Sequence, residues 1–197
     1  MPVIAPIHHL LYYERLLRHS VWRNVLRVVY HEPLFKTCCE HVGRNLHVWG
    51  GLPVVMGHLR IRIGNDVRIC GVTTLSAATM AEQPLLEIGD NSYVGYQVTI
   101  TVGARVSIGR HVLIANRVLI AGDDGHPSDP IARRSQPGRG DGAITIEDDV
   151  WVCDAAIILK GVTIGAGSIV AAAAVVTDDV PPRSLVAGNP ARVVKHL

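Results

Sequence analysis

The residues best suited to acid–base chemistry gather in one polar stretch of the chain. His126 lies there, with Asp123 and Asp124 before it and Asp129 after it. A histidine can take and return a proton near neutral pH, and a carboxylate on its second ring nitrogen fixes the tautomer and stabilises the imidazolium. The pattern predicts a general base at His126, oriented by Asp124 or Asp129. The alternative is a polar loop histidine without a catalytic task.

The element that must position this histidine is a six-residue repeat. An aliphatic residue recurs at every sixth position, at Ile146, Val152, Ile158, Ile164, Val170 and Val176. Six is a multiple of the two-residue period of a strand, so each hexad can form a short strand followed by a corner. Three hexads close a triangular coil, and coils stack about 4.8 Å apart through parallel ladders. The sequence predicts an all-β parallel β-helix in which Ile146 stacks under Ile164, Val152 under Val170 and Ile158 under Val176.

Two stretches interrupt the repeat. The first spans residues 76–87, and the second spans residues 122–143 and carries His126. A polar loop of that length in a compact solenoid is usually functional or disordered. Because aliphatic stacks fill the interior of such a prism, the functional site must lie on its outside or between copies.

Residues 5–30 follow a helical period instead. One face would carry Ile7, Leu10, Leu17, Val21, Val25 and Val28, and another the basic residues Arg15, His19, Arg23 and Arg27. We expect the apolar face to cap the open end of the solenoid, which every β-helix must cover. The alternative is a helix that lies on an anionic membrane surface. The chain is thus divided into a helical segment, residues 1–36, and a β-helix domain, residues 37–197.

Composition narrows the class of protein. The formal net charge is only +2, without the basic stripe typical of a nucleic-acid-binding protein. The four cysteines form no C-x-x-C pair, which indicates reduced thiols. The N-terminus lacks a signal peptide, and no apolar run is long enough to span a bilayer. We expect a cytoplasmic protein, at the inner face of the membrane if the helix binds lipid.

Three ordered motifs carry a resemblance to a known family. They are HPSDPIAR (126–133), DDVW (148–151) and AGNPAR (187–192), within the hexads from about residue 60 to residue 195. This stretch resembles the hexapeptide-repeat O-acetyltransferases, which include galactoside, maltose and nodulation-factor acetyltransferases and enzymes that modify lipopolysaccharide or capsule sugars. The resemblance implies a left-handed β-helix and a homotrimer with active sites between adjacent prisms. It also implies acetyl-CoA as co-substrate, with no resident cofactor or metal, and places His126 at the position of the catalytic base.

The same resemblance assigns the acceptor side of the site. Trp151 matches a tryptophan that helps to form the acceptor or pantetheine wall, and Arg133 ends the first motif. Relatives often carry an asparagine in the stretch YVGYQVTI, where Gln97 or Tyr96 would have to serve here.

The CoA groove should run along the late coils, where small residues leave room for a thin pantetheine chain. The candidates are Ala155, Lys160, Ala172, Thr177, Arg183 and Arg192, with the cations facing phosphates. Relatives commonly carry a lysine near CoA where this chain has Asp178. The phosphate contact therefore has to come from another residue, or the affinity for CoA is reduced.

The sequence therefore predicts acetyl transfer to a sugar hydroxyl, in the assembly of cell-surface polysaccharide or lipopolysaccharide. A serine or another small hydroxyl acceptor is the alternative within the same enzyme class. A zinc lyase of the γ-carbonic-anhydrase kind needs two histidines five residues apart, and no pair here has that spacing. A non-catalytic trimeric scaffold would have no use for the His126 loop.

Overall fold

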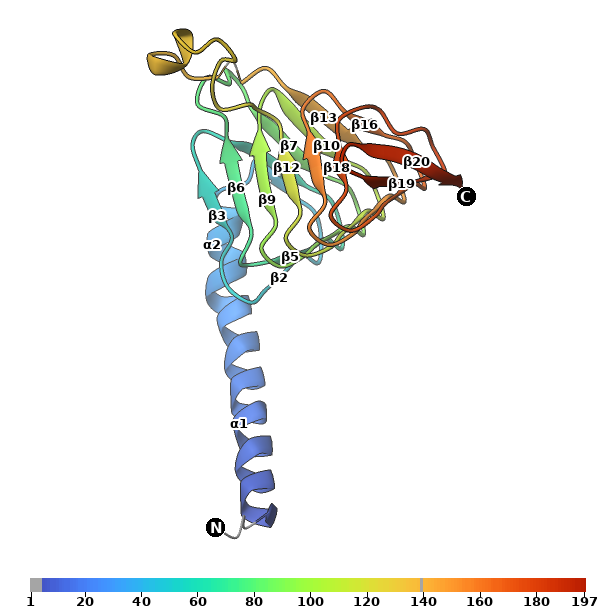
Figure 1. The fold of residues 1–197 in the computed structure, drawn as a ribbon. Helices are drawn as coiled ribbons and strands as arrows, with labels where there is room; N and C mark the ends of the chain where they lie inside the picture. Colours follow the sequence, from blue (N-terminus) through green and yellow to red (C-terminus); the bar gives the residue numbers. More distant parts are fainter. Residues whose placement is uncertain (1–4, 139) are drawn as a thin grey trace.

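Most of the chain forms one three-sided parallel solenoid (Figure 1). A computed structural model describes residues 5–138 and 140–197. Successive strands are distributed in turn over three sheets, so that sheets A and C each have six strands and sheet B has eight. The parallel β-helix predicted from the hexads is confirmed.

The strands are short, as a six-residue repeat requires. Sheet A contains β1 (His41–Val42), β4 (Arg60–Ile63), β7 (Leu85–Ile88), β10 (Arg105–Ile108), β13 (Ala143–Ile146) and β16 (Thr163–Ile164). Sheet B contains β2 (His47–Trp49), β5 (Arg68–Cys70), β8 (Tyr93–Val94), β11 (Leu113–Ile114), β14 (Trp151–Val152), β17 (Ile169–Val170), β19 (Ser184–Gly188) and β20 (Ala191–His196). Sheet C contains β3 (Val54–Met56), β6 (Thr74–Ala77), β9 (Thr99–Val102), β12 (Leu119–Ala121), β15 (Ile157–Leu159) and β18 (Val175–Val176). Among the strands of the described residues, only β20, which pairs with β19, is antiparallel to its neighbour.

The stacking register follows the hexads. Ile146 pairs with Ile164, Val152 with Val170, and Ile158 with Val176, as the sequence predicts. All six side chains are at most 1% exposed. Each buried aliphatic side chain contributes roughly 1.5–3 kcal/mol through removal of its surface from water, so the columns together form a continuous core.

Three edges separate the sheets, and the turns at each edge lie in a column. Edge AB comprises residues 43–46, 64–67, 89–92, 109–112, 147–150, 165–168 and 181–183. Edge BC comprises residues 50–53, 71–73, 95–98, 115–118, 153–156 and 171–174. Edge CA comprises residues 57–59, 78–84, 103–104, 122–142, 160–162 and 177–179. Both interruptions of the repeat are therefore insertions at edge CA, and the first is shorter than predicted because β6 continues to Ala77 and β7 begins at Leu85.

The outward sides of the sheets differ in charge. On sheet A, Glu40 and Glu87 form ion pairs with Arg60, Arg62 and Arg105. On sheet C, the outward columns are uncharged throughout; they are Val54, Thr74, Thr99, Leu119, Ile157 and Val175, and Met56, Ser76, Thr101, Ala121 and Leu159. On sheet B, the outward column from the third coil onward is Tyr93, Leu113, Trp151, Ile169 and Leu185. Two of the three faces thus suit contact with protein better than contact with water.

The N-terminal segment consists of α1 (Ala5–Leu26), the π-helical turn η1 (Arg27–His31) and α2 (Glu32–Lys36). The cap of the solenoid is the last of these, because Phe35 is 1% exposed and belongs to the core. Buried Glu32 accepts a hydrogen bond from the backbone N–H of Val48 in the first coil (3.2 Å) and pairs with Arg27 (2.6 Å).

The prediction that residues 5–30 lie across the first coils is wrong. Helix α1 extends beyond the solenoid (Figure 1), and Leu10 and Leu17 on its apolar face are 70% and 67% exposed. Its amphipathic pattern was a correct sign of a helix but says nothing about what the apolar face contacts. None of the helices in residues 5–138 and 140–197 has the length and apolarity needed to cross a membrane.

Candidate active site

The loop that carries His126 begins at Gly122 and ends at Gly142, both at edge CA. Residues 122–142 connect β12 to β13. A Cβ placed on Gly142 would lie 2.1 Å from the carbonyl oxygen of Gly122. Glycine is required there because the two legs of the loop touch at their base.

Asp123 ties the two legs together beside the histidine. Its Oδ2 accepts a hydrogen bond from the N–H of Gly125 (3.0 Å), and its Oδ1 accepts one from the N–H of Gly140 (3.2 Å). The N–H of Gly138 also donates to the carbonyl of Gly125 (2.8 Å). One carboxylate therefore joins the outgoing and the returning strand of the loop within three residues of His126.

The shorter detour supports the same loop from the side. Gly140 has a φ of +67°, and a Cβ there would lie 2.6 Å from the backbone nitrogen of Ala81. The carbonyl of Ala81 is in turn hydrogen-bonded to Nε2 of His58 (2.6 Å). The loop is thus braced by residues 78–84 as well as by its own backbone.

His126 lies at an open cavity of about 470 Å³. Polar and small residues line it, namely Asp124, Pro127, Ser128, Asp129, Ala132, Gln136, Pro137, Gly138, Asp141 and Lys160. Within the described residues the His126 ring forms no hydrogen bond, and the residue is exposed. Both ring nitrogens can therefore meet an incoming group.

The two aspartates predicted to orient His126 have other partners in this conformation. Asp124 pairs with Nζ of Lys160 (2.6 Å), and this hydrogen bond raises the pKa of the lysine above its ordinary value. Oδ1 of Asp129 accepts from the N–H groups of Ile131 (3.1 Å) and Ala132 (2.7 Å). Asp129 thereby accepts a hydrogen bond from the N–H group of the first residue of the short 3-10 helix Ala132–Arg134, on which Arg133 is exposed.

The predicted acceptor residues lie on other parts of the prism. Trp151 begins β14 on the outward side of sheet B and is 47% exposed. Tyr96 and Gln97 form a turn at edge BC, where Gln97 has a φ of +56°. Within one chain, only Arg133 of the predicted acceptor set lies on the His126 loop.

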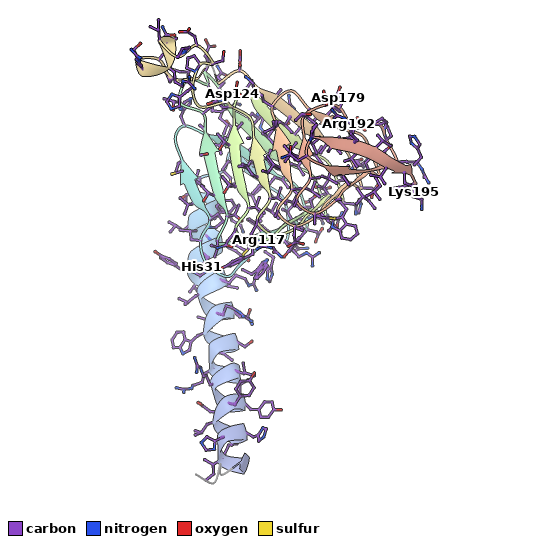
Figure 2. All side chains as sticks on the ribbon, in the orientation of Figure 1. His31, Arg117, Asp124, Asp179, Arg192 and Lys195 are labelled. Atoms are coloured by element: carbon purple, nitrogen blue, oxygen red, sulfur yellow. The ribbon has the colours of Figure 1, made fainter. Side chains whose placement is uncertain are left out.

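The predicted cofactor residues fall into three groups. Lys160 and Thr177 lie at edge CA with the His126 loop, whereas Ala155 and Ala172 lie at edge BC and Arg183 at edge AB. Arg192 pairs with Asp178 across 3.2 Å, and the hydroxyl of Thr177 donates to the same carboxylate (2.9 Å). Figure 2 shows Asp124, Asp179 and Arg192 along one margin of the solenoid and Arg117 at the opposite one. Within one chain the predicted cofactor residues are thus spread over all three edges of the solenoid.

Cys153 at edge BC is a weak candidate for a nucleophile. Burial raises the pKa of its thiol, and the nearby Asp154 adds to this effect. A raised pKa lowers the fraction of reactive thiolate near neutral pH. The residue is better described as a small side chain at a corner.

Sequence reasoning missed Asp123 and His58 as supports of the site. Asp123 was one of three neighbouring carboxylates, and its position two residues before a glycine is the available signal, since an Asx side chain often accepts a bond from the backbone two residues on. Nothing local to His58 indicates that it reaches Ala81, because the contact spans 23 residues of sequence.

Comparison with known proteins gives relatives of one kind. No model of a protein family matches the chain. It is 41% identical over 110 residues to the putative acetyltransferase YJL218W of Saccharomyces cerevisiae, covering 56% of this chain and 55% of that protein. It is 37% identical over 112 residues to the galactoside O-acetyltransferase of Escherichia coli, covering 57% and 54%. The chain spans about half the length of these curated relatives.

A solved structure covers more of the chain. It is the hexapeptide-repeat-containing acetyltransferase VCA0836 of Vibrio cholerae in complex with acetyl coenzyme A, with 31% identity and a TM-score of 0.57. The match covers 84% of this chain and 75% of that one. The fold and the loop at edge CA together define the class of protein: a parallel β-solenoid with a histidine on a loop outside its core. The chain belongs to the hexapeptide-repeat acetyltransferase family.

The bridge made by Asp123 predicts a specific defect. Asp123→Ala removes both carboxylate acceptors, including the one that joins the two legs of the loop through Gly140, so the loop should open while the solenoid stays folded. We expect faster proteolytic cleavage within residues 124–138 at an unchanged melting temperature. Asp141→Ala, which removes an exposed carboxylate from the same excursion, is the matched control. Equal cleavage rates for the two variants would show that Asp123 does not hold the loop.

Proposed function

We propose that this protein is an acetyl-CoA-dependent O-acetyltransferase that acts on a sugar hydroxyl. The observation that carries the proposal is the placement of His126, on a braced loop with its ring open to a polar cavity, in a chain of this family. The other elements of the proposal are the path of CoA, the assembly of the site and the class of acceptor.

The reaction needs one proton acceptor. As the acceptor hydroxyl oxygen attacks the thioester carbonyl, a nitrogen of His126 takes the hydroxyl proton, and the imidazolium then returns it to the departing sulfur. A thiolate leaves readily because the pKa of a thiol is about 8.5, so no stronger acid is required. Direct transfer of this kind has no use for Cys153 as an acyl carrier. Asp124 would orient the ring only after release from Lys160, and Asp129 only by giving up its backbone partners.

Edge CA supports a path for CoA. Lys160 lines the cavity at this edge, Thr177 lies further along the edge, and Thr177 and Arg192 contact the same Asp178 carboxylate. With the acetyl group at His126, the pantetheine would follow the edge and the phosphates would meet Arg192. Asp178 already pairs with that arginine, so it competes with phosphate for the same guanidinium. Arg183 at edge AB could contact the same CoA only from a neighbouring copy, whereas Ala155 and Ala172 at edge BC lie away from this path.

The distribution of charge supports a homotrimer. Three prisms around an axis each contact two neighbours through two adjacent faces. Since sheet A carries the ion pairs, sheets B and C are the faces suited to contact, with edge BC toward the axis. Sheet C of one copy then faces sheet B of the next. The His126 loop at edge CA would overlie the neighbouring face that carries Trp151, whereas Tyr96 and Gln97 would lie near the axis.

The acceptor proposed is a sugar in the assembly of cell-surface polysaccharide or lipopolysaccharide. The cavity offers Ser128, Gln136 and Asp129 as hydrogen-bonding groups, which suits a ligand rich in hydroxyls. The galactoside O-acetyltransferase of Escherichia coli supports the same class of acceptor. Because acetyl-CoA is the donor, we place the reaction in the cytoplasm.

Loss of the base should lower turnover without loss of the donor. For His126→Ala we expect kcat to fall by about 10²–10⁴-fold, the usual size of general-base catalysis, with little change in the Kd for acetyl-CoA. Release of the CoA thiol, measured with a panel of sugars and amino acids, tests both the activity and the acceptor class. His41→Ala, on the charged sheet A, is the control. Near-normal kcat in His126→Ala would remove the residue from this role.

Substitutions of Arg192 and Asp178 should shift the KM for acetyl-CoA in opposite directions. Arg192→Ala should raise the KM because it removes a phosphate contact, and Asp178→Asn should lower it because the competing carboxylate is gone. Since neither touches the reacting carbonyl, kcat should change little. Steady-state kinetics at fixed acceptor measures the split; an effect confined to kcat would contradict the assignment.

A charge on an uncharged face should break the trimer. Ile157→Glu places a carboxylate in the outward column of sheet C, where it would be buried without a partner. We expect light scattering to show a trimer for the unaltered protein and monomers for this variant, with activity lost on dissociation. Thr145→Glu on sheet A is the control and should remain trimeric. An active monomer would overturn the two-chain site.

A further inference from the structure

The apolar surface of this chain is concentrated on its N-terminal helix. More than half of the exposed large apolar side chains among the described residues belong to residues 7–30. In α1 they include Leu10 at 70%, Leu17 at 67% and Trp22 at 64% exposure. A cluster of exposed apolar side chains on a protein surface usually marks a contact with another protein or with a membrane.

The solenoid of the same chain does not cover this helix. Its first coil is already capped by α2, through Phe35 and Glu32. Helix α1 continues from there away from the coils and beyond the margin of the solenoid (Figure 1). The apolar side chains of α1 therefore need a partner from outside the chain.

The pattern of residues around α1 matches a lipid surface. Ile7, Leu10, Leu17, Val21 and Val25 follow one another at steps of three, four or seven residues and so share one stripe of the helix. Glu14 lies within the same stripe, where its carboxylate is paired with Arg18. Tyr13 and Trp22 lie on the two flanks of this stripe, whereas Tyr12 lies on the opposite side of the helix. Tyr and Trp favour the region between lipid headgroups and acyl chains, because each combines an apolar ring with a polar group.

The charges of α1 are complementary to an anionic surface. The helix contains three arginines and one glutamate, and that glutamate, Glu14, accepts a hydrogen bond from Arg18 (3.0 Å). Arg15 and Arg23 therefore remain to meet lipid phosphates. The arginines also favour a helix that lies on the bilayer over one that spans it, because charged side chains are costly in the hydrocarbon.

A coiled coil with a second copy fits the same helix poorly. Seven-residue steps from Ile7 meet Glu14 before Val21, and those from Leu10 meet Leu17 and then Asn24. Both seams of a heptad pattern are thus broken by a polar residue within about four turns of the helix, where a coiled coil needs apolar side chains.

We propose that α1 is a lipid-binding helix that holds the protein on an anionic membrane surface, with the stripe from Ile7 to Val25 in the headgroup region. The inference does not depend on the acetyl-transfer activity. It would bring the site at edge CA close to acceptors that are themselves attached to lipid.

Vesicle sedimentation of the full chain tests the proposal. At low salt we expect the protein to pellet with vesicles of phosphatidylcholine and phosphatidylglycerol, and about tenfold less with phosphatidylcholine alone, since basic side chains add to the binding. Leu17→Glu should lose most of the binding to the anionic vesicles. His9→Glu adds the same charge outside the stripe and is the matched control. A full chain that stays in the supernatant with anionic vesicles overturns the proposal, as does equal loss in both variants.

Two further measurements exclude the alternatives. Brominated lipids should quench fluorescence of the full chain, and the quenching should disappear in Trp22→Phe, which keeps Trp49 and Trp151. Persistent quenching in that variant would place the contact elsewhere. Light scattering without lipid should give the same oligomer for Leu17→Glu and His9→Glu. A smaller oligomer for Leu17→Glu alone would show that a second copy, and not lipid, covers the stripe.

Discussion

The stacking of one aliphatic column on the next is the interaction on which this structure depends. Each inward Ile or Val packs on the residue one coil below, and the backbone between them pairs in a parallel ladder. β-Branched side chains suit such a surface because their rotamers are already restricted. The interior is consequently dry and filled, as Ile120 and Val170 illustrate with no exposed surface. Charged and catalytic groups are therefore confined to the outward faces and to the edges, where the chain turns.

The candidate site lies at an edge of the solenoid, outside the apolar core, and its loop is therefore held by hydrogen bonds. The loop with His126 has no core of its own, so it is supported by the carboxylate of Asp123, which accepts hydrogen bonds from backbone N–H groups, and by the neighbouring detour through Ala81 and His58. Support of this kind fixes the base of the loop and leaves its tip open. The open tip lies next to the uncharged face of sheet C, which supports the proposal that a second copy completes the site, since a single prism with a filled interior cannot enclose one.

The sequence predicts the solenoid well because its signal is repeated. Six hexads agree on the register of Ile146 with Ile164, so an error at one position is corrected by the others. The site has no such redundancy. Asp124, which looked equivalent to Asp123, is drawn to Lys160 by a contact across 36 positions that no local pattern encodes. The place of α1 was also beyond reach, because a helical period identifies an apolar stripe and not the surface that covers it.

The excursion at residues 122–142 has a consequence for how such a protein can change over time. β10 pairs with β13 from Arg105↔Ala143 to Ile108↔Ile146, and β12 pairs with β15 at Ile120↔Ile158, as though the intervening loop were absent. Residues inserted at a corner therefore do not change the register of strand pairing. Insertions and deletions there can be sampled almost freely, while the same change inside a strand would shift every later column by one face. The fold therefore accepts insertions at its corners but not within its strands. Loops at the corners can change, and with them the acceptor that binds, while the stacked strands remain the same.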